Sequence, residues 1–218
     1  MAPPGLLSVY SRLHRSYGHA AWWPARTAFE VCVGAILTQN TAWSNVEKAL
    51  AVLRRHGLLS HAKLRAVPLY RLGLLIRSSG VFRIKARRLR AFLDFLHHEY
   101  GGRVARMRRE SPDVLRRKLL AVHGIGPETA DSIALYAAGQ PLFVVDAYTR
   151  RIFTRLGVLE GGESYDAVQR VFMDALPRDV SLFNDYHAQI VRLAKEVCRV
   201  RPRCALCPLT RVCPKRGV

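Results

Sequence analysis

The chain has 218 residues, 50% of them hydrophobic, and carries 35 lysines and arginines against 16 aspartates and glutamates, a formal charge of +19. This composition supports one sizeable core or two small ones and excludes disordered and collagen-like chains. No apolar run approaches the roughly 18 residues that span a bilayer, and residues 1–17 lack the apolar stretch of a secretion signal. We therefore expect neither a membrane nor a secreted protein, and the positive surplus favours a nucleic-acid partner.

Apolar residues recur at the i, i+3, i+4 and i+7 spacing of amphipathic helices along most of the chain. This spacing predicts helices within 29–37, 46–53, 86–96, 115–122 and 190–197. Glycine and proline separate these segments, and the apolar run 143–145 is too short to build a sheet. The sequence therefore predicts an all-α fold.

A glycine-rich turn interrupts two of the predicted helices within residues 119–133. Gly124 and Gly126 flank Ile125, and Pro127 opens the second helix. The two glycines allow a tight turn in which Ile125 faces the core, while free backbone amides beside a helix start suit a phosphate group. We expect Gly124, Ile125 and Gly126 to bind a nucleic-acid backbone.

Asp146 follows the apolar run 143–145 and opens another helix. From its position alone it is either a helix cap or a functional carboxylate. The segment 119–151 as a whole resembles the helix-hairpin-helix and aspartate signature of the endonuclease III superfamily of DNA glycosylases. This resemblance implies that Asp146 is catalytic: it stabilises positive charge on the deoxyribose as the glycosidic bond breaks, and it helps to activate the nucleophile.

Four of the five cysteines lie near the end of the chain in a Cys-x5-Cys-x2-Cys-x5-Cys pattern, namely Cys198, Cys204, Cys207 and Cys213. Clustered thiols in a chain without a secretion signal usually bind metal, and the spacing alone fits either tetrahedral zinc or an iron–sulfur cluster. The resemblance to endonuclease III implies a [4Fe-4S] cluster, although the first gap is five residues here and usually six in that family. Cys32 stands apart, among apolar neighbours, as a buried hydrophobic residue.

Glu128 occupies the position at which bifunctional members of this superfamily carry a lysine. A carboxylate cannot form the imine through which that lysine cleaves the strand, so we expect a monofunctional enzyme that uses water. Lys195 aligns with a pocket lysine of the 3-methyladenine DNA glycosylases, and it is the remaining amine that we suspect of chemistry.

The segments 22–24 and 29–43 are similar to the 3-methyladenine branch of the superfamily. This similarity implies a base pocket that contains Trp22, Trp43 and Glu128, with the two indole rings on either face of a flipped, cationic purine. It also implies that Gln39 fills the space left by the flipped nucleotide and that Val81 is an apolar wedge on the opposite strand.

The resemblance implies two helical domains on either side of a DNA cleft. A central multi-helix barrel would span 26–140, with the hairpin at about 112–138, and an iron–sulfur domain would combine 1–25 with 141–218, its cluster loop at 198–213. The expected partner is double-stranded DNA that contains a damaged base or an abasic site. We expect a monomer in the cytoplasm, associated with the nucleoid if the source is bacterial.

The expected activity is base-excision repair: the enzyme flips a damaged base, most simply an alkylated purine, and hydrolyses its N-glycosidic bond. One alternative is an endonuclease III-type enzyme that acts on oxidised pyrimidines and has lyase activity. A second alternative is a damaged-DNA-binding protein with little catalysis, because the loss of the lysine at Glu128 permits that as well.

Overall fold

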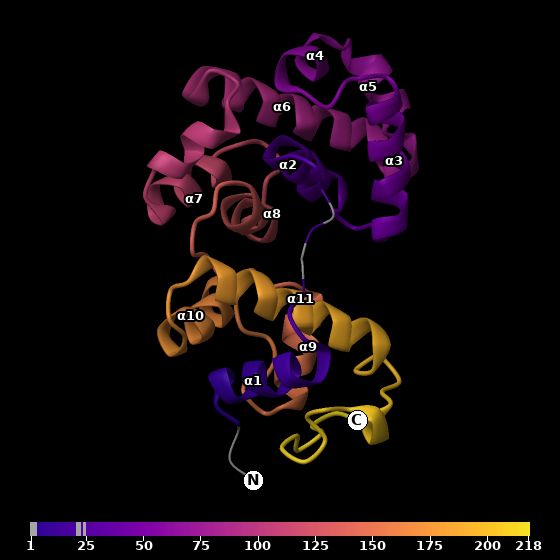
Figure 1. Ribbon diagram of the computed structural model, residues 1–218. Helices are drawn as coiled ribbons and strands as arrows, with labels where there is room; N and C mark the ends of the chain where they lie inside the picture. Colours follow the sequence, from indigo (N-terminus) through magenta and orange to yellow (C-terminus); the bar gives the residue numbers. More distant parts are fainter. Residues whose placement is uncertain (1–3, 21–22, 24) are drawn as a thin grey trace. The chain divides into compact units, whose positions relative to one another are not determined.

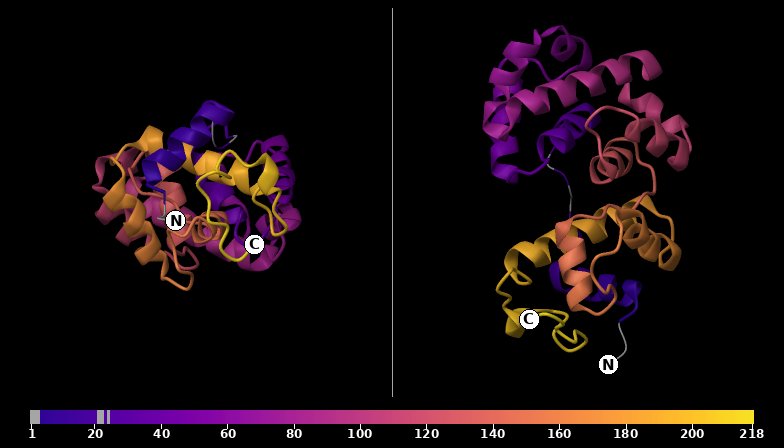
Figure 2. Two further views of the ribbon diagram at one scale, coloured as in Figure 1. Left: turned by 90° about the horizontal axis from the view of Figure 1, so that it is seen from below. Right: turned by 180° about the vertical axis from the view of Figure 1, so that it is seen from behind.

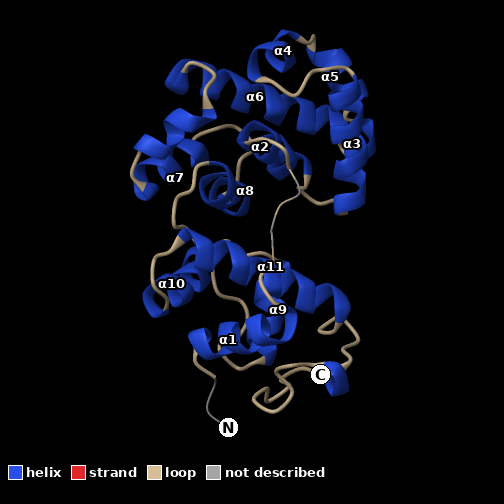
Figure 3. Ribbon diagram, in the orientation of Figure 1, coloured by secondary structure: helices blue, strands red, loops and turns tan. Residues whose placement is uncertain are grey.

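The computed structural model describes residues 4–20, 23 and 25–218, and every regular element in these ranges is helical (Figures 1 and 3). The all-α prediction is confirmed. The chain divides into two compact units, one of Met1–Trp22 with Pro141–Val218 and one of Trp23–Gln140. In the described ranges, no helix has the length and apolar character needed to cross a membrane.

The unit of residues 23–140 is built around one buried helix. Its elements are α2 (Ala28–Leu37), α3 (Trp43–Arg55), α4 (His61–Ala66), α5 (Leu69–Leu75), η1 (Arg77–Ser79), α6 (Phe82–Tyr100), η2 (Val104–Arg109), α7 (Pro112–Leu120), α8 (Pro127–Ser132) and the π-helical η3 (Ile133–Ala137). All residues from Glu30 to Leu37 of α2 are buried, as expected for a helix that is apolar on every face. Helices α3, α6 and α8 pack around it (Figure 3).

One helix in this unit ends earlier than its periodicity indicates. Leu115 and Leu119 lie on the buried face of α7, which ends at Leu120. The predicted helix extended to 122, but Val122 belongs to the turn that follows and is buried from there. The apolar side chain of Val122 therefore indicates a buried position, but it does not indicate that the backbone there is helical.

The second unit joins the two ends of the chain. It contains α1 (Leu6–Tyr17), α9 (Ala147–Arg155), α10 (Tyr165–Ala175), α11 (Val180–Glu196) and η4 (Cys204–Leu206). Helix α1 lies beside α11, although they are far apart in sequence (Figure 2). Aromatic rings fill the core between the helices, and Phe143 stacks on Phe172 with a ring-centroid distance of 4.1 Å. This core holds the segment before Asp146 in place.

Candidate active site and cluster loop

The turn between α7 and α8 has a backbone that requires glycine at its centre. Gly124 has φ +79°, and a side chain at this position would run into the side chain of Arg88. Ile125 is 5% exposed and packs inward, whereas Gly126 faces open space. The outer part of the turn therefore consists of backbone atoms, and the Ile125 side chain packs into the core beneath it.

Gln39, just beyond the end of α2, is bonded to this turn. Its Nε2 donates to the carbonyl oxygen of Gly124 and to the hydroxyl of Thr129, each at 3.0 Å. Its Oε1 accepts a hydrogen bond from Arg88 Nη1 at 2.6 Å. The structure thus places Gln39 between the hairpin, which its Nε2 contacts, and α6, whose Arg88 contacts its Oε1.

Two further residues with predicted DNA or pocket roles are solvent-accessible in this unit. Val81 precedes α6 and is 59% exposed. Glu128 lies in the first turn of α8 and is exposed. Both side chains are accessible to a ligand of this unit.

A cluster of three aromatic rings lies at the start of α3. Trp23 meets Trp43 edge-on at a centroid distance of 5.4 Å and lies 5.2 Å from the ring of Tyr136 in η3. Gly34 permits this approach, since a Cβ there would come within 3.3 Å of the Trp23 ring. Trp22, predicted as the partner of Trp43, lies outside the described residues. Sequence reasoning missed Trp23 and Tyr136, although the Trp-Trp pair was a signal for the first.

Asp146 is the N-cap of α9 in the other unit. Its Oδ1 accepts hydrogen bonds from the backbone N–H of Thr149 at 2.7 Å and from the Thr149 hydroxyl at 2.9 Å. Its Oδ2 lies 3.5 Å from Nε2 of His187, a buried residue of α11. Burial raises the pKa of Asp146, but the hydrogen bond and charge of His187, with the two bonds from Thr149, outweigh it and hold the pKa below its usual value. The carboxylate is therefore fixed in orientation and ionised.

Lys195 lies on the same helix as His187, eight residues further on. At 1.5 Å per residue this separation is about 12 Å along α11. The Lys195 side chain is exposed, and its backbone carbonyl accepts a hydrogen bond from Arg199 Nε at 2.6 Å. The α11 residue that contacts Asp146 is therefore His187 and not Lys195, and apolar periodicity contains no signal for this contact.

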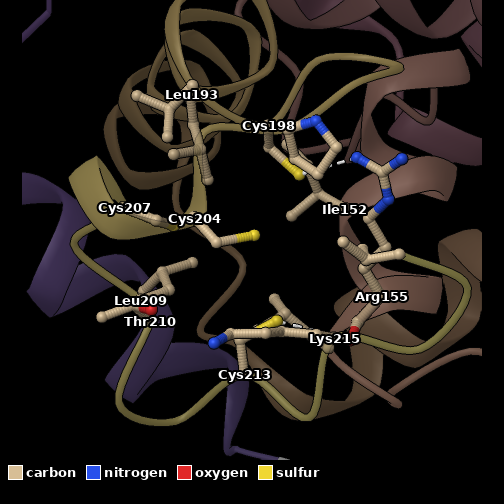
Figure 4. Close-up of a pocket in the computed structure, with 14 residues that line it drawn as sticks. Ile152, Arg155, Leu193, Cys198, Cys204, Cys207, Leu209, Thr210, Cys213 and Lys215 are labelled. Atoms are coloured by element: carbon tan, nitrogen blue, oxygen red, sulfur yellow. Dashed lines mark hydrogen bonds between the residues drawn. The ribbon is translucent and has the colours of Figure 1, made fainter.

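The four C-terminal cysteines line one cavity together with apolar side chains of α9 and α11. Figure 4 shows the thiol groups of Cys198, Cys204 and Cys213 pointing into this shared space. Arg155, 9% exposed, donates to Cys198 Sγ at 3.4 Å and to the carbonyl oxygen of Arg199 at 2.6 Å. The last turn of α9 thus holds the cysteine loop (residues 198–213).

The cysteine loop has a donor set that fits a thiolate-ligated metal group. Burial, and to a smaller extent the like charges of the three other cysteines, raise the pKa of Cys207 to about 11. Four neighbouring thiolates are unfavourable unless a cation offsets their charge, which is the role of iron or zinc in such loops. In the described ranges, no three His, Cys, Asp or Glu side chains are placed closely enough to hold a metal ion as they stand.

This fold is shared with solved DNA glycosylases. An endonuclease III–DNA complex matches with a TM-score of 0.81 over 96% of this chain and 94% of that chain at 24% identity, a likeness of fold. The 3-methyladenine DNA glycosylase of H. pylori bound to 1,N6-ethenoadenine matches with a TM-score of 0.76 and 27% identity, over 88% of this chain and 96% of that chain. The chain therefore has the helical fold of these DNA glycosylases.

The family follows from the sequence comparisons. Residues 33–178 match the model of the HhH-GPD superfamily base excision DNA repair proteins, and the chain belongs to this family. It is 43% identical over 210 residues to a protein of Methanocaldococcus jannaschii assigned as a DNA repair glycosylase, covering 95% of each chain. It is 30% identical to endonuclease III of Thermotoga maritima over 85% of this chain and 82% of that one. The chain is a base-excision DNA glycosylase of this superfamily.

Proposed function

We propose that the protein is a monofunctional glycosylase that removes alkylated purines from double-stranded DNA by using water as the nucleophile. The observation that carries the proposal is an ionised carboxylate at Asp146, fixed by Thr149 and His187, combined with a carboxylate instead of an amine at Glu128. The solved relative with 1,N6-ethenoadenine, a modified purine, supports the substrate class.

Asp146 lowers the barrier by electrostatic stabilisation. As the N-glycosidic bond breaks, its electron pair leaves with the base nitrogen and positive charge develops on the sugar. A carboxylate already held in place stabilises this charge without reorganising. The oxygen of water then bonds to C1′ and loses a proton, for which Oδ2 of Asp146, the oxygen not bonded to Thr149, is the available base. This chemistry needs no lysine.

The aromatic cluster of Trp23, Trp43 and Tyr136 supports the choice of an alkylated purine. N-alkylation makes a purine electron-poor and often cationic, and the face of an indole ring attracts such a ring. An alkylated purine is also a good leaving group, so modest catalysis is sufficient for its release. The predicted pocket of Trp22, Trp43 and Glu128 would place a carboxylate beside the cationic base.

The cysteine loop would hold a [4Fe-4S] cluster through Cys198, Cys204, Cys207 and Cys213. When bound, such a cluster supplies a rigid cross-link for the end of the chain. Arg155 connects the loop to α9, the helix that begins at Asp146. A stable loop would therefore support the helix that carries the catalytic carboxylate.

The test is base release and strand cleavage on a panel of duplexes. The panel contains methylated DNA, thymine glycol, uracil mismatches and an abasic site, each with and without hot alkali. Release of methylpurines, with nicking after alkali alone, is the expected result. Nicking of thymine-glycol or abasic DNA without alkali would favour the endonuclease III-type alternative and point to another amine, Lys195 first. Binding without release of any base would favour the damage-binding alternative.

A further inference from the structure

Lys85 is a fully buried lysine in the first turn of α6. Its ammonium group donates a hydrogen bond to the carbonyl oxygen of Leu37 at 2.8 Å and another to the carbonyl oxygen of Ser79. Leu37 is the last residue of α2, and Ser79 is the last residue of η1. One side chain therefore joins the ends of two elements to the beginning of a third.

The buried ammonium group has an energetic cost that simple packing does not explain. Its hydrogen bonds in the described ranges go to two carbonyl groups. Burial and the neighbouring Arg88 lower the pKa of Lys85 to about 8, so the surroundings disfavour its charge. An apolar side chain of similar length would fill the same space without that cost. A methionine has no hydrogen-bond donor, whereas the lysine donates to both carbonyl groups at once. The contribution of Lys85 is therefore the link between Leu37 and Ser79.

The two acceptors of Lys85 lie next to the two residues with predicted roles inside the duplex. Leu37 is two residues before Gln39, and Ser79 is two residues before Val81. The same helix also reaches Gln39 directly, through the hydrogen bond from Arg88 one turn after Lys85. Lys85 and Arg88, on one face of α6, thus contact both the segment that contains Gln39 and the segment that precedes Val81.

A second contact fixes the same pair of segments. The hydroxyl of Ser78 donates to the carbonyl oxygen of Asn45, at the start of α3, at 3.0 Å. Gly80, with φ +89°, turns the chain between Ser79 and Val81 close to Thr41. The segment before Val81 and the segment after Gln39 are therefore packed as one body, with Lys85 beneath them.

We propose that Lys85 is a positioning residue for base flipping, which fixes the spacing between Gln39 and Val81 so that both enter the duplex together. The inference rests on the proposed glycosylase function and on the roles expected for those two side chains. Flipping a base out of the duplex costs a few kcal/mol of lost stacking. Inserted side chains offset this cost only if both occupy their places in the duplex at the same time. A preformed pair avoids the entropy of ordering two loops on DNA.

The experiment compares Lys85→Met with wild type on two duplexes of the same sequence. In one, the damaged base has its pairing partner; in the other, it faces an abasic site and has no base pair to break. We expect single-turnover base release to fall about tenfold or more on the paired duplex and less than about threefold on the gapped one, because only the first needs insertion. Arg87→Met removes one exposed charge from the same helix and is the matched control.

Equal losses on the two duplexes, or no loss on either, would overturn the proposal. Thermal unfolding checks that Lys85→Met is folded; if it is not, Lys85→Arg is compared in the same way. A 2-aminopurine beside the target reports flipping without base release. A wild-type protein that releases no base would refute the proposed function, whereas the fluorescence comparison would still decide the role of Lys85.

Discussion

His187 Nε2 lies 3.5 Å from Oδ2 of Asp146, and this contact joins two helices that are separated in the sequence by α10. The other carboxylate oxygen is bonded to Thr149, within the helix that Asp146 itself begins. Local capping therefore orients one oxygen, and tertiary packing between α9 and α11 defines the surroundings of the other. A carboxylate held in this way stabilises a developing cation without first having to move.

Replacing Asp146 with Asn should abolish most of the base release while leaving DNA binding intact. Asparagine is as good an N-cap as aspartate, so α9 should keep its start. The lost charge should lower the single-turnover rate by about 100-fold or more. Asp179→Asn is a matched control, because Asp179 also caps a helix of this unit, through the N–H of Leu182 at 2.7 Å. Comparable rates for the two variants would remove Asp146 from the mechanism.

His187→Gln should change the pH dependence of base release. The hydrogen bond and charge of His187 lower the pKa of Asp146 against the effect of burial, so removing them should raise that pKa. The ionised fraction of Asp146 then falls at a higher pH in the variant than in wild type, so the ratio of variant to wild-type rate should decrease as the pH is lowered toward the usual aspartate pKa of about 4. His56→Gln, at an exposed imidazole, is the control. A ratio that does not vary with pH would limit His187 to a packing role.

Glu128→Lys should introduce an amine at the position of the lyase lysine. We expect borohydride to trap a covalent complex with abasic DNA in this variant and not in wild type, because only an amine forms the imine. Glu128→Gln, which removes the charge without adding an amine, should not be trapped. The lysine reverses a favourable charge in the first turn of α8, so a loss of about 0.3–1 kcal/mol in stability is expected. Trapping of the wild-type protein would contradict the monofunctional proposal.

The periodicity of apolar residues was sufficient to predict helices at the positions of α2, α3, α6, α7 and α11, but it did not identify short helices such as α4 and α5. Contacts that depend on the packing of distant helices were not accessible in this way. The contact of His187 with Asp146 is one example, and the two carbonyl acceptors of Lys85 are another. Backbone carbonyl groups leave no trace in residue types, so no spacing rule could identify a lysine that bridges them.

An iron–sulfur cluster bound by the cysteine loop should give the purified protein a visible colour. We expect an absorbance shoulder near roughly 400 nm, from thiolate-ligated iron, that is lost in Cys213→Ser. Cys32→Ala should keep it, because Cys32 is fully buried in α2, within the other unit. Iron and zinc analysis of the same samples completes the test. A colourless wild-type protein with stoichiometric zinc would show that the loop holds zinc.

Asp185 should be a main determinant of stability in the unit that contains both chain ends. Its buried carboxylate accepts hydrogen bonds from Tyr10 at 2.8 Å and from the backbone N–H of Ala20 at 2.7 Å, and it pairs with His14 at 2.9 Å. Burial raises the pKa of Asp185, but these hydrogen bonds outweigh it and hold the pKa below the usual value. A folded-state pKa below the unfolded one stabilises the protein above about pH 4, and this contribution is lost as the pH falls further.

Asp185→Asn should therefore lower the free energy of unfolding by about 1–3 kcal/mol at neutral pH, since donors that faced a carboxylate lose a strong acceptor. The difference from wild type should narrow as the pH falls below about 4, where wild-type Asp185 itself begins to be protonated. Urea unfolding at several pH values measures both effects. Asp174→Asn, at an exposed carboxylate of α10, is the control and should stay within about 0.5 kcal/mol of wild type. A difference that is constant across this pH range would show that the charge of Asp185 is not what stabilises the contact between α1 and α11.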